Sequence, residues 1–196
     1  AMNQTDKLVS VLMPAYNAQS TIATAIQSVL SQTHTDLELI IVNDASTDYT
    51  VQEIQKFDDP RILVLTLASN GGPGPARNAA IDRATGAWIT LIDADDLWAP
   101  QRLEKLLGAA GSTEDGRMIA DEIVEVFDTP GGLQEWQKTW EGQIPKLAPT
   151  TEISLARYLS LARTVMQPLI PRRILANGKL RYSSISAAED FEFYIR

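Results

Sequence analysis

The sequence predicts an α/β fold with a doubly wound, mainly parallel sheet and flanking helices. Its first hundred residues alternate four short apolar runs with three helix-like stretches, the β-α-β-α-β-α-β order of a parallel sheet. The apolar runs are nearly uninterrupted, so we expect helices to cover both faces of the sheet. A length of 196 residues supports one domain, or a domain with a small annex.

Each element of this alternation has a local signal. The predicted strands are short apolar runs, at residues 8–13, 37–42, 62–67 and 87–92. The first predicted strand ends at Pro14, because proline cannot donate to a strand ladder. The predicted helices follow capping or loop residues; they cover 22–30 after a Ser20-Thr21 cap, 51–57 after capping residues at 45–48, and 76–85, with Gly86 as the helix stop.

The rhythm changes after Pro100, and we expect residues 1–110 and 111–196 to form two halves of one domain. The second half has weaker patterns. They predict helices at 101–107, 152–162 and 187–196, a more exposed strand at 117–127, a turn at 128–132, and an edge strand at 164–170 that contains Pro168.

Composition excludes several kinds of site. The chain has no cysteine, which rules out disulfides, zinc ribbons, iron–sulfur clusters and thiol nucleophiles, and its one histidine, His34, rules out a polyhistidine metal site. The net charge of −8 makes the chain a poor general binder of nucleic acid, because phosphate contacts need lysine and arginine. Carboxylates therefore carry most of any chemistry, and a divalent cation on oxygen ligands is their natural partner.

An acidic cluster is the strongest functional signal. Asp93, Asp95 and Asp96 follow directly after a predicted buried strand. Three carboxylates in four residues repel one another unless a cation or hydrogen-bond donors compensate them, and Mg²⁺ or Mn²⁺ sites use one or two carboxylates plus phosphate oxygens. The alternative is a solvated turn that caps the following helix. The position at the carboxyl end of a strand favours the metal interpretation.

Three further candidates have an ordinary alternative each. Asp44 ends the second strand and could accept hydrogen bonds from a base or ribose, or simply interact with a helix dipole. The glycine-rich stretch 71–78 with Arg77 could bind an anion, or be a plain loop. The pair Glu189-Asp190 could supply a general base, or two acids at a helix start.

Two other residue types are weaker candidates. His34 lies in a polar loop between a helix and a strand, where we expect it to be solvated. The four tryptophans could belong to the core or stack on a sugar, and Trp98, which follows the acidic cluster, is the first candidate for stacking.

These pieces together resemble the family 2 glycosyltransferases, which are inverting enzymes of the GT-A fold. The resemblance runs from Leu8 to the chain end, and five matching stretches occur in the right order and spacing: residues 9–17, 39–50, 70–78, 91–98 and 189–190. One departure is Asn43-Asp44, where the family usually has two adjacent aspartates. The chain stops six residues after Asp190, so we expect a domain truncated at its C-terminus.

The resemblance implies a role for each matching residue. It makes residues 1–110 the nucleotide-sugar donor-binding half and residues 111–196 the acceptor-side half. The implied roles are a nucleotide pocket lined by Pro14, Ala15 and Tyr16, a base contact at Asp44, a base or phosphate contact at Arg77, a ribose and donor-sugar contact at Asp93, a Mn²⁺ or Mg²⁺ ligand at Asp95, and the general base at Asp190.

The implied function is metal-dependent, inverting transfer of a sugar from a nucleotide-diphosphate sugar, UDP-linked in the first instance, to an acceptor hydroxyl. The acceptor would be a saccharide or a lipid-linked saccharide of surface or extracellular polysaccharide synthesis. Two alternatives stay open: a nucleotide-sugar-binding module without turnover, and a nucleotidyltransferase, which the absence of a basic triphosphate loop disfavours. With no export signal or apolar span, we expect a cytoplasmic protein, with peripheral contact to the inner membrane as an option.

Overall fold

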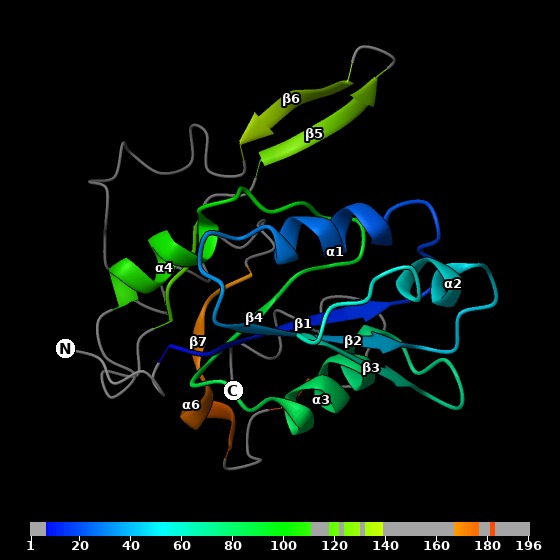
Figure 1. The fold of residues 1–196 in the computed structure, drawn as a ribbon, viewed down its shortest axis with the longest axis horizontal. Helices are drawn as coiled ribbons and strands as arrows, with labels where there is room; N and C mark the ends of the chain where they lie inside the picture. The colour runs from blue at the N-terminus through cyan, green and yellow to red at the C-terminus, as the bar shows by residue number, and fades with distance from the viewer. Residues whose placement is uncertain are drawn as a thin grey trace. The chain divides into compact units, whose positions relative to one another are not determined.

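A computed structural model describes residues 7–110, 118–121, 124–129, 132–138, 167–176 and 181–182 (Figure 1). The chain folds as two compact units, one formed by residues 1–119 with 168–196 and the other by residues 120–167. The first unit contains the sheet and every described residue of the candidate site.

The first unit is built on a five-stranded sheet. Its strands are β1 (Val9–Ala15), β2 (Leu37–Asn43), β3 (Ile62–Thr66), β4 (Trp88–Leu91) and β7 (Ile170–Pro171), in the order β3-β2-β1-β4-β7. The first four strands are parallel, and β7 pairs antiparallel with β4 at the sheet edge. The predicted parallel, doubly wound sheet is therefore confirmed. Strand order reverses between β1 and β4, which is where such sheets bind ligands.

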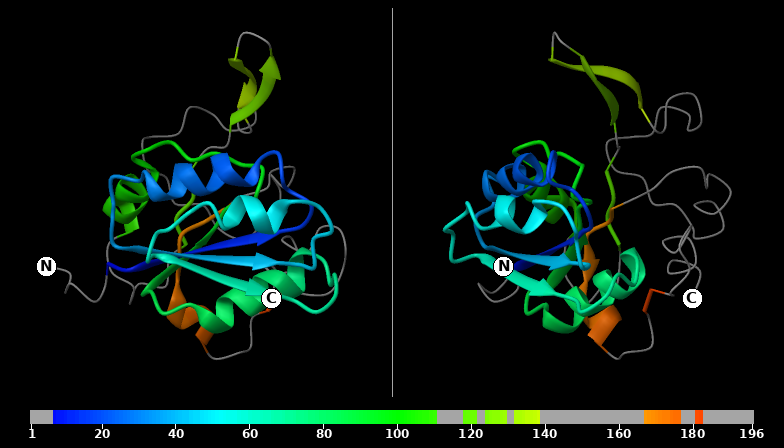
Figure 2. Two further views of the ribbon diagram at one scale, coloured as in Figure 1. Left: turned by 45° about the vertical axis from the view of Figure 1, so that its right-hand side comes forward. Right: turned by 90° about the vertical axis from the view of Figure 1, so that its right-hand side faces the viewer.

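Helices cover both faces of this sheet. The face with α1 (Ile22–Leu30) also carries α2 (Thr50–Ile54) and α4 (Arg102–Ala110), and the opposite face carries α3 (Pro73–Arg83) and α6 (Arg172–Ala176) (Figures 1 and 2). Two-sided coverage explains why the central strands are apolar at nearly every position.

The core alternates along each strand. In β1, Val9, Val11 and Met13 belong to one buried cluster with residues of α1 and α4. Leu12 is also fully buried but lies outside that cluster, and strand alternation points its side chain toward the other face. Helix α3 packs on that face with small side chains, including the fully buried Ala76 and Ala80. The small residues allow the close approach of α3 to β1 and β2.

Strand β1 does not end at Pro14. It runs to Ala15, and Pro14 pairs in register with Val42. The Leu12 carbonyl accepts a hydrogen bond from Ile92 N at 3.0 Å, so the backbone groups of Leu12 face β4. Residues two apart in a strand face the same neighbour, so the Pro14 nitrogen also faces the β4 side, at a level beyond the last residue of β4. A proline is tolerated there because no ladder hydrogen bond is lost.

Helix α3 starts earlier and ends earlier than predicted. It begins at Pro73, inside the stretch predicted as loop, because proline in the first helical turn has a suitable φ and loses no intrahelical hydrogen bond. It ends at Arg83, and Ala84 is already extended. Gly86 therefore is not the helix stop.

The predicted caps of α1 and α2 are only partly right. Thr21 stands at the N-cap of α1, but its hydroxyl donates to the Ala18 carbonyl rather than capping the helix. Asp48 does act at the start of α2, where its carboxylate accepts from the Thr50 backbone N–H at 2.9 Å and from the Thr50 hydroxyl. Tyr49 is the N-cap residue of α2 and no side chain caps the helix itself, so the polar stretch only shapes the turn that leads into it.

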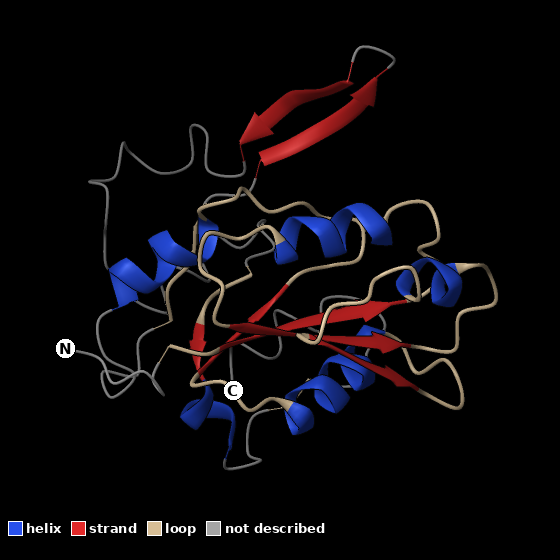
Figure 3. Ribbon diagram, in the orientation of Figure 1, coloured by secondary structure: helices blue, strands red, loops and turns tan. Residues whose placement is uncertain are grey.

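The second unit contains an antiparallel hairpin of β5 (Val124–Thr129) and β6 (Gly132–Lys138) (Figure 3). The predicted strand 117–127 is wrong as a single element, because Ile119 bridges Leu169 in the first unit and β5 begins only at Val124. Sequence patterning also missed β6, whose apolar residues Leu133 and Trp136 stand three apart and hide the period of two. The predicted helices 152–162 and 187–196 lie outside the described residues.

A polar cluster ties the strand starts together at the end of the sheet opposite the acidic residues. The Ser10 hydroxyl donates to Glu38 Oε1, which also accepts from the backbone N–H groups of Thr85 at 2.7 Å and Gly86 at 3.2 Å. Burial raises the pKa of the Glu38 carboxyl, but these hydrogen bonds outweigh it and the net pKa lies below the usual 4.5.

Glu38→Gln should lower the free energy of unfolding by about 1–2 kcal/mol at neutral pH, because a neutral amide accepts these hydrogen bonds less strongly. Because the pKa of Glu38 is lowered in the folded state, its carboxylate contributes stability above pH 4.5 that is lost as the pH falls through the folded-state pKa. The variant lacks this titrating group, so its free energy of unfolding should fall less steeply at acid pH. Urea unfolding between pH 2.5 and 7 measures this. Glu53→Gln, which removes a surface acid paired with Lys56, is the control. An unchanged fall at acid pH in Glu38→Gln would contradict the assignment.

Candidate active site

The carboxyl ends of β1, β2 and β4 bring three polar segments together. Asp44 N donates to the Ala15 carbonyl at 2.9 Å, which joins the end of β2 to the end of β1. On the other side of β1, Leu91 pairs with Leu12, and Asp93 follows two residues later. Pro14, Ala15 and Tyr16 therefore lie between Asp44 and the acidic cluster, at the reversal of strand order.

Two loops at this edge are joined by hydrogen bonds around Asn17. Asn17 N donates to Ser46 Oγ at 3.1 Å, and Asn17 Oδ1 accepts from Thr47 N at 2.8 Å. Asn17 adopts a left-handed φ of 50°, which asparagine tolerates better than most residues. Tyr16 precedes this junction and is 50% exposed, so its ring is accessible beside a fixed loop pair.

Asn43 is buried and acts within its own loop. Its Oδ1 accepts from Ser46 N at 3.0 Å, and the chain turns between them through Ala45, at a φ of 56°. The amide that replaces the first aspartate of the family pattern therefore shapes the turn that carries Asp44.

Asp44 holds the glycine loop. Its side chain is 2% exposed, and its two carboxylate oxygens accept from Gly71 N at 2.9 Å and Gly72 N at 2.8 Å. Gly72 has a left-handed φ of 84° directly before α3. Asp44 thus fixes the path of the chain into α3, a role that sequence reasoning did not predict for it.

Arg77 and Asp93 form an ion pair across the site. Arg77 lies in α3 and is 5% exposed, and its Nη2 donates to Asp93 Oδ1 at 3.0 Å. The Asp93 side chain is 34% exposed, so its carboxylate is paired with the protein while still meeting solvent. The structure thereby brings the glycine stretch and the acidic cluster to one place.

The acidic turn itself is tight and firmly anchored. Asp96 N donates to the Asp93 carbonyl at 3.0 Å, and Asp95 at the tip is exposed. The buried side chain of Gln32 holds the following segment, because its amide donates to the Ala99 carbonyl at 2.8 Å and accepts from Leu103 N at 3.0 Å. The segment that follows the acidic turn is thus held by a glutamine that no sequence signal marked.

Within the described residues, no three Asp, Glu or His side chains converge on one point. The acidic turn therefore does not form a complete protein cage for a metal. Exposed carboxylate oxygen at Asp95 still suits a hard divalent cation that completes its shell with phosphate oxygens.

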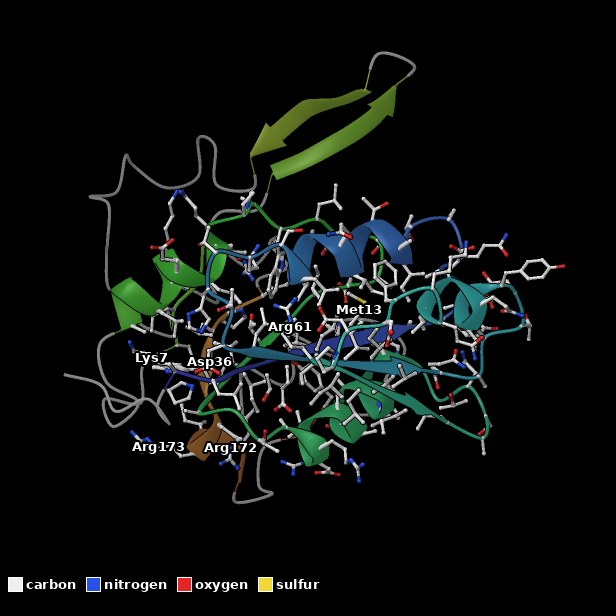
Figure 4. All side chains as sticks on the ribbon, in the orientation of Figure 1. Lys7, Met13, Asp36, Arg61, Arg172 and Arg173 are labelled. Carbon is white, nitrogen blue, oxygen red and sulfur yellow. The ribbon has the colours of Figure 1, made fainter. Side chains whose placement is uncertain are left out.

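Trp98 is not a sugar-stacking platform. It is 6% exposed and packs in the core, with the Arg102 guanidinium 4.4 Å from its ring centroid. His34, predicted to be solvated, is half-buried and lies away from the site. Its Nε2 lies 3.0 Å from the carbonyls of Lys7 and Asp36, at the amino end of the sheet, where Figure 4 labels those two residues.

Sequence reasoning also missed a contact between α3 and the C-terminal part of the chain. Asn78, next to Arg77, hydrogen-bonds the backbone of Tyr182, 104 residues away. No local sequence pattern predicts a contact between residues so far apart in the chain. The predicted base, Asp190, and its neighbour Glu189 lie outside the described residues.

Comparison with protein families gives one match over most of the chain. The model for "Glycosyl transferase family 2" matches residues 10–153. Succinoglycan biosynthesis protein ExoO of Rhizobium meliloti is 32% identical over 189 residues, covering 93% of this chain and 53% of ExoO. The Escherichia coli protein named UDP-Glc:alpha-D-GlcNAc-diphosphoundecaprenol beta-1,3-glucosyltransferase WfgD is 43% identical over 99 residues, covering 50% of this chain and 39% of WfgD. The chain thus spans about half, or less, of these relatives.

Solved structures share the fold. S. aureus TarS 1-349 in complex with UDP-GlcNAc is 25% identical with a TM-score of 0.69, over 95% of this chain and 52% of that one. The mannosyltransferase PcManGT from Pyrobaculum calidifontis, solved with GDP-Man and Mn²⁺, has a TM-score of 0.61 at 18% identity, over 93% of this chain and 49% of that one. In the part of the chain that the structure describes, no helix combines the length and apolarity needed to cross a membrane.

Proposed function

The chain belongs to glycosyl transferase family 2, and from that premise we propose that it binds the nucleotide-sugar donor of a metal-dependent, inverting glycosyltransferase. The donor is a UDP-sugar and the acceptor is a saccharide hydroxyl in surface or extracellular polysaccharide synthesis. One observation carries this proposal: Asp44, the Arg77–Asp93 ion pair and the exposed Asp95 gather where β2 and β4, the two strands that flank β1, reach their carboxyl ends.

The nucleoside would lie along the end of β1. Pro14 and Ala15, at the end of β1, would form the floor of this site, and the exposed Tyr16 ring could stack on a base. Each Asp44 oxygen accepts one backbone hydrogen bond and retains a second lone pair, so Asp44 can contact a base while still holding the glycine loop. WfgD is named for UDP-Glc and TarS was solved with UDP-GlcNAc, which supports uracil as the base.

The diphosphate and the first sugar would lie over the acidic turn. Asp93 is placed to accept hydrogen bonds from ribose or donor-sugar hydroxyls with the oxygen that Arg77 does not hold. Asp95 would hold Mn²⁺ or Mg²⁺, which when bound supplies positive charge to the diphosphate. PcManGT, solved with Mn²⁺, supports a cation in this fold.

Transfer would be a single in-line displacement. Asp190 takes the proton of the acceptor hydroxyl while the oxygen of that hydroxyl bonds to the anomeric carbon. The bond between that carbon and the diphosphate oxygen breaks, and the nucleoside diphosphate leaves with the electron pair. Arg77, near the phosphates, stabilises the charge that grows on the leaving group. The name of WfgD points to a lipid-linked acceptor, which would bring the enzyme to the cytoplasmic surface of the inner membrane.

Thermal unfolding with UDP tests the donor site. UDP with Mn²⁺ should raise the melting temperature of the chain, and Asp95→Ala should abolish the rise, because the carboxylate that would hold the cation is removed. Asp58→Ala, which removes an exposed acid before β3, is the matched control and should keep the rise.

Three outcomes decide between the candidate functions. No shift with UDP, GDP or any other nucleoside diphosphate would refute the proposal. A rise in melting temperature without slow hydrolysis of any nucleotide sugar would indicate a binding module without turnover. In that case Asp190→Asn would leave nucleotide binding unchanged and would have no activity to remove. Release of pyrophosphate from a nucleoside triphosphate would indicate a nucleotidyltransferase.

A further inference from the structure

The backbone of Tyr182 is bound to α3 by one side chain. Asn78 Nδ2 donates to the Tyr182 carbonyl at 2.8 Å, and Asn78 Oδ1 accepts from Tyr182 N at 2.9 Å. A carboxamide is suited to this contact because it presents a donor and an acceptor side by side. The pair imitates the exchange of hydrogen bonds between two strands, so it sets the position of residue 182 along α3.

The neighbouring residue adds a second attachment on the same helix face. Arg181 Nη2 donates to Asp82 Oδ1 at 2.9 Å, and Arg181 Nη1 donates to the Leu175 carbonyl of α6 at 2.9 Å. Asp82 stands four residues after Asn78, so both contacts lie on one side of α3. Asp82 is 63% exposed, so its ion pair contributes less than the Asn78 contact.

These contacts place the Tyr182 ring against Arg77. The ring is buried, with Tyr182 4% exposed, and the Arg77 guanidinium carbon lies 5.2 Å from its centroid. Arg77 in turn donates to Asp93 at 3.0 Å. A continuous series of contacts therefore runs from Asn78 through Tyr182 and Arg77 to Asp93.

We propose that Asn78 and Tyr182 are positioning residues of the donor site, which hold the Arg77 guanidinium in the orientation that binds Asp93. Arginine has several rotatable bonds, and a ring stacked on its guanidinium restricts them before the ligand arrives. The donor site is then complete only when residues 181–182 are docked on α3. This inference rests on the proposed function, since it assigns Arg77 and Asp93 to the donor.

Side-chain NMR of the arginine Nε–Hε groups tests the positioning without any ligand. The Arg77 signal, assigned with Arg77→Lys, should show a ring-current shift and restricted motion in the unmodified chain. Tyr182→Phe should preserve both, whereas Tyr182→Leu and Asn78→Asp should remove both. An Arg77 signal in the unmodified chain with the shift and mobility of solvent-exposed arginines would overturn the inference, whether or not the Tyr182 and Asn78 variants fold.

UDP affinity in the presence of Mn²⁺ tests the link to function. Tyr182→Leu and Asn78→Asp should each weaken binding about tenfold, the loss expected from one desolvated cation–π contact. Tyr182→Phe should retain the affinity, as should Arg83→Ala, an exposed arginine on the same helix. In an Arg77→Met background, Tyr182→Leu should have no further effect. Additive losses, or unchanged affinity in Tyr182→Leu, would overturn the inference.

The two proposals fail in different ways. If the unmodified chain binds no nucleoside diphosphate, the proposed function fails, and the NMR result still decides whether Tyr182 positions Arg77. If the chain binds UDP but Tyr182→Leu binds it equally well, the function stands and the positioning role is refuted.

Discussion

Gly86→Ala should destabilise the fold by about 3–5 kcal/mol, among the largest effects expected of a single methyl group. A Cβ at this position would lie 2.6 Å from the Leu8 carbonyl oxygen and 2.7 Å from Ser10 N. Both atoms are backbone atoms at the start of β1, so neither can rotate away as a side chain would. Gly86 N also donates to Ser10 Oγ at 2.9 Å, and that hydrogen bond must shift with the backbone. Urea unfolding measures the loss, and insoluble protein is the extreme form of the same result.

Gly108→Ala is the matched control for this substitution. Gly108 lies in α4, and a methyl group added there would meet open space, with no neighbouring side chain or strand within 4 Å. Alanine is favoured over glycine in a helix by about 0.8–1.0 kcal/mol, so this variant should be as stable as the unmodified chain or slightly more stable. A Gly86→Ala protein of normal stability would contradict the close approach of the chain at Gly86 to β1.

The example of Gly86 shows what local sequence signals can and cannot give. A glycine after a helical stretch commonly ends the helix, and the prediction used that preference. In the structure the helix ends at Arg83, and Gly86 is required by a neighbour 76 residues earlier in the sequence, Ser10. The four apolar strands were predictable because burial on both faces leaves a strong local pattern. The need for glycine at position 86 was not predictable, because it arises only when the chain before β4 packs against the start of β1.

The candidate site divides in the same way. Strand order determines which residues gather at the carboxyl ends of the strands. The described part of that edge includes Asp44, Arg77, Asp93 and Asp95. How they contact one another does not follow, since the Asp44 contact with Gly71 and Gly72 and the Arg77 contact with Asp93 depend on loop paths. Residues 111–196 gave the weakest predictions because the described strands β5 and β6 are mixed in polarity, so amphipathic periodicity carries little information there.

Asp44→Asn should have the largest effect on ligand binding outside the acidic turn. The asparagine has one acceptor oxygen, and its amide N–H₂ would face the N–H of either Gly71 or Gly72, two donors against each other. Replacing two hydrogen bonds to a buried carboxylate in this way should cost about 3 kcal/mol, or about 6–12 °C in melting temperature. The glycine loop would then lose its fixed path into α3, and UDP with Mn²⁺ should raise the melting temperature little or not at all.

Asp36→Asn separates this specific effect from the loss of one negative charge. Asp36, labelled in Figure 4, is exposed just before β2. Asp44 is buried just beyond the carboxyl end of that strand. Both substitutions change the net charge by the same amount, so Asp36→Asn controls for the change in net charge. Asp36→Asn should keep both the stability and the UDP response. If Asp44→Asn also kept them, Asp44 would neither hold the loop nor contact the base, and the donor site would have to be built from β1 and the acidic turn alone.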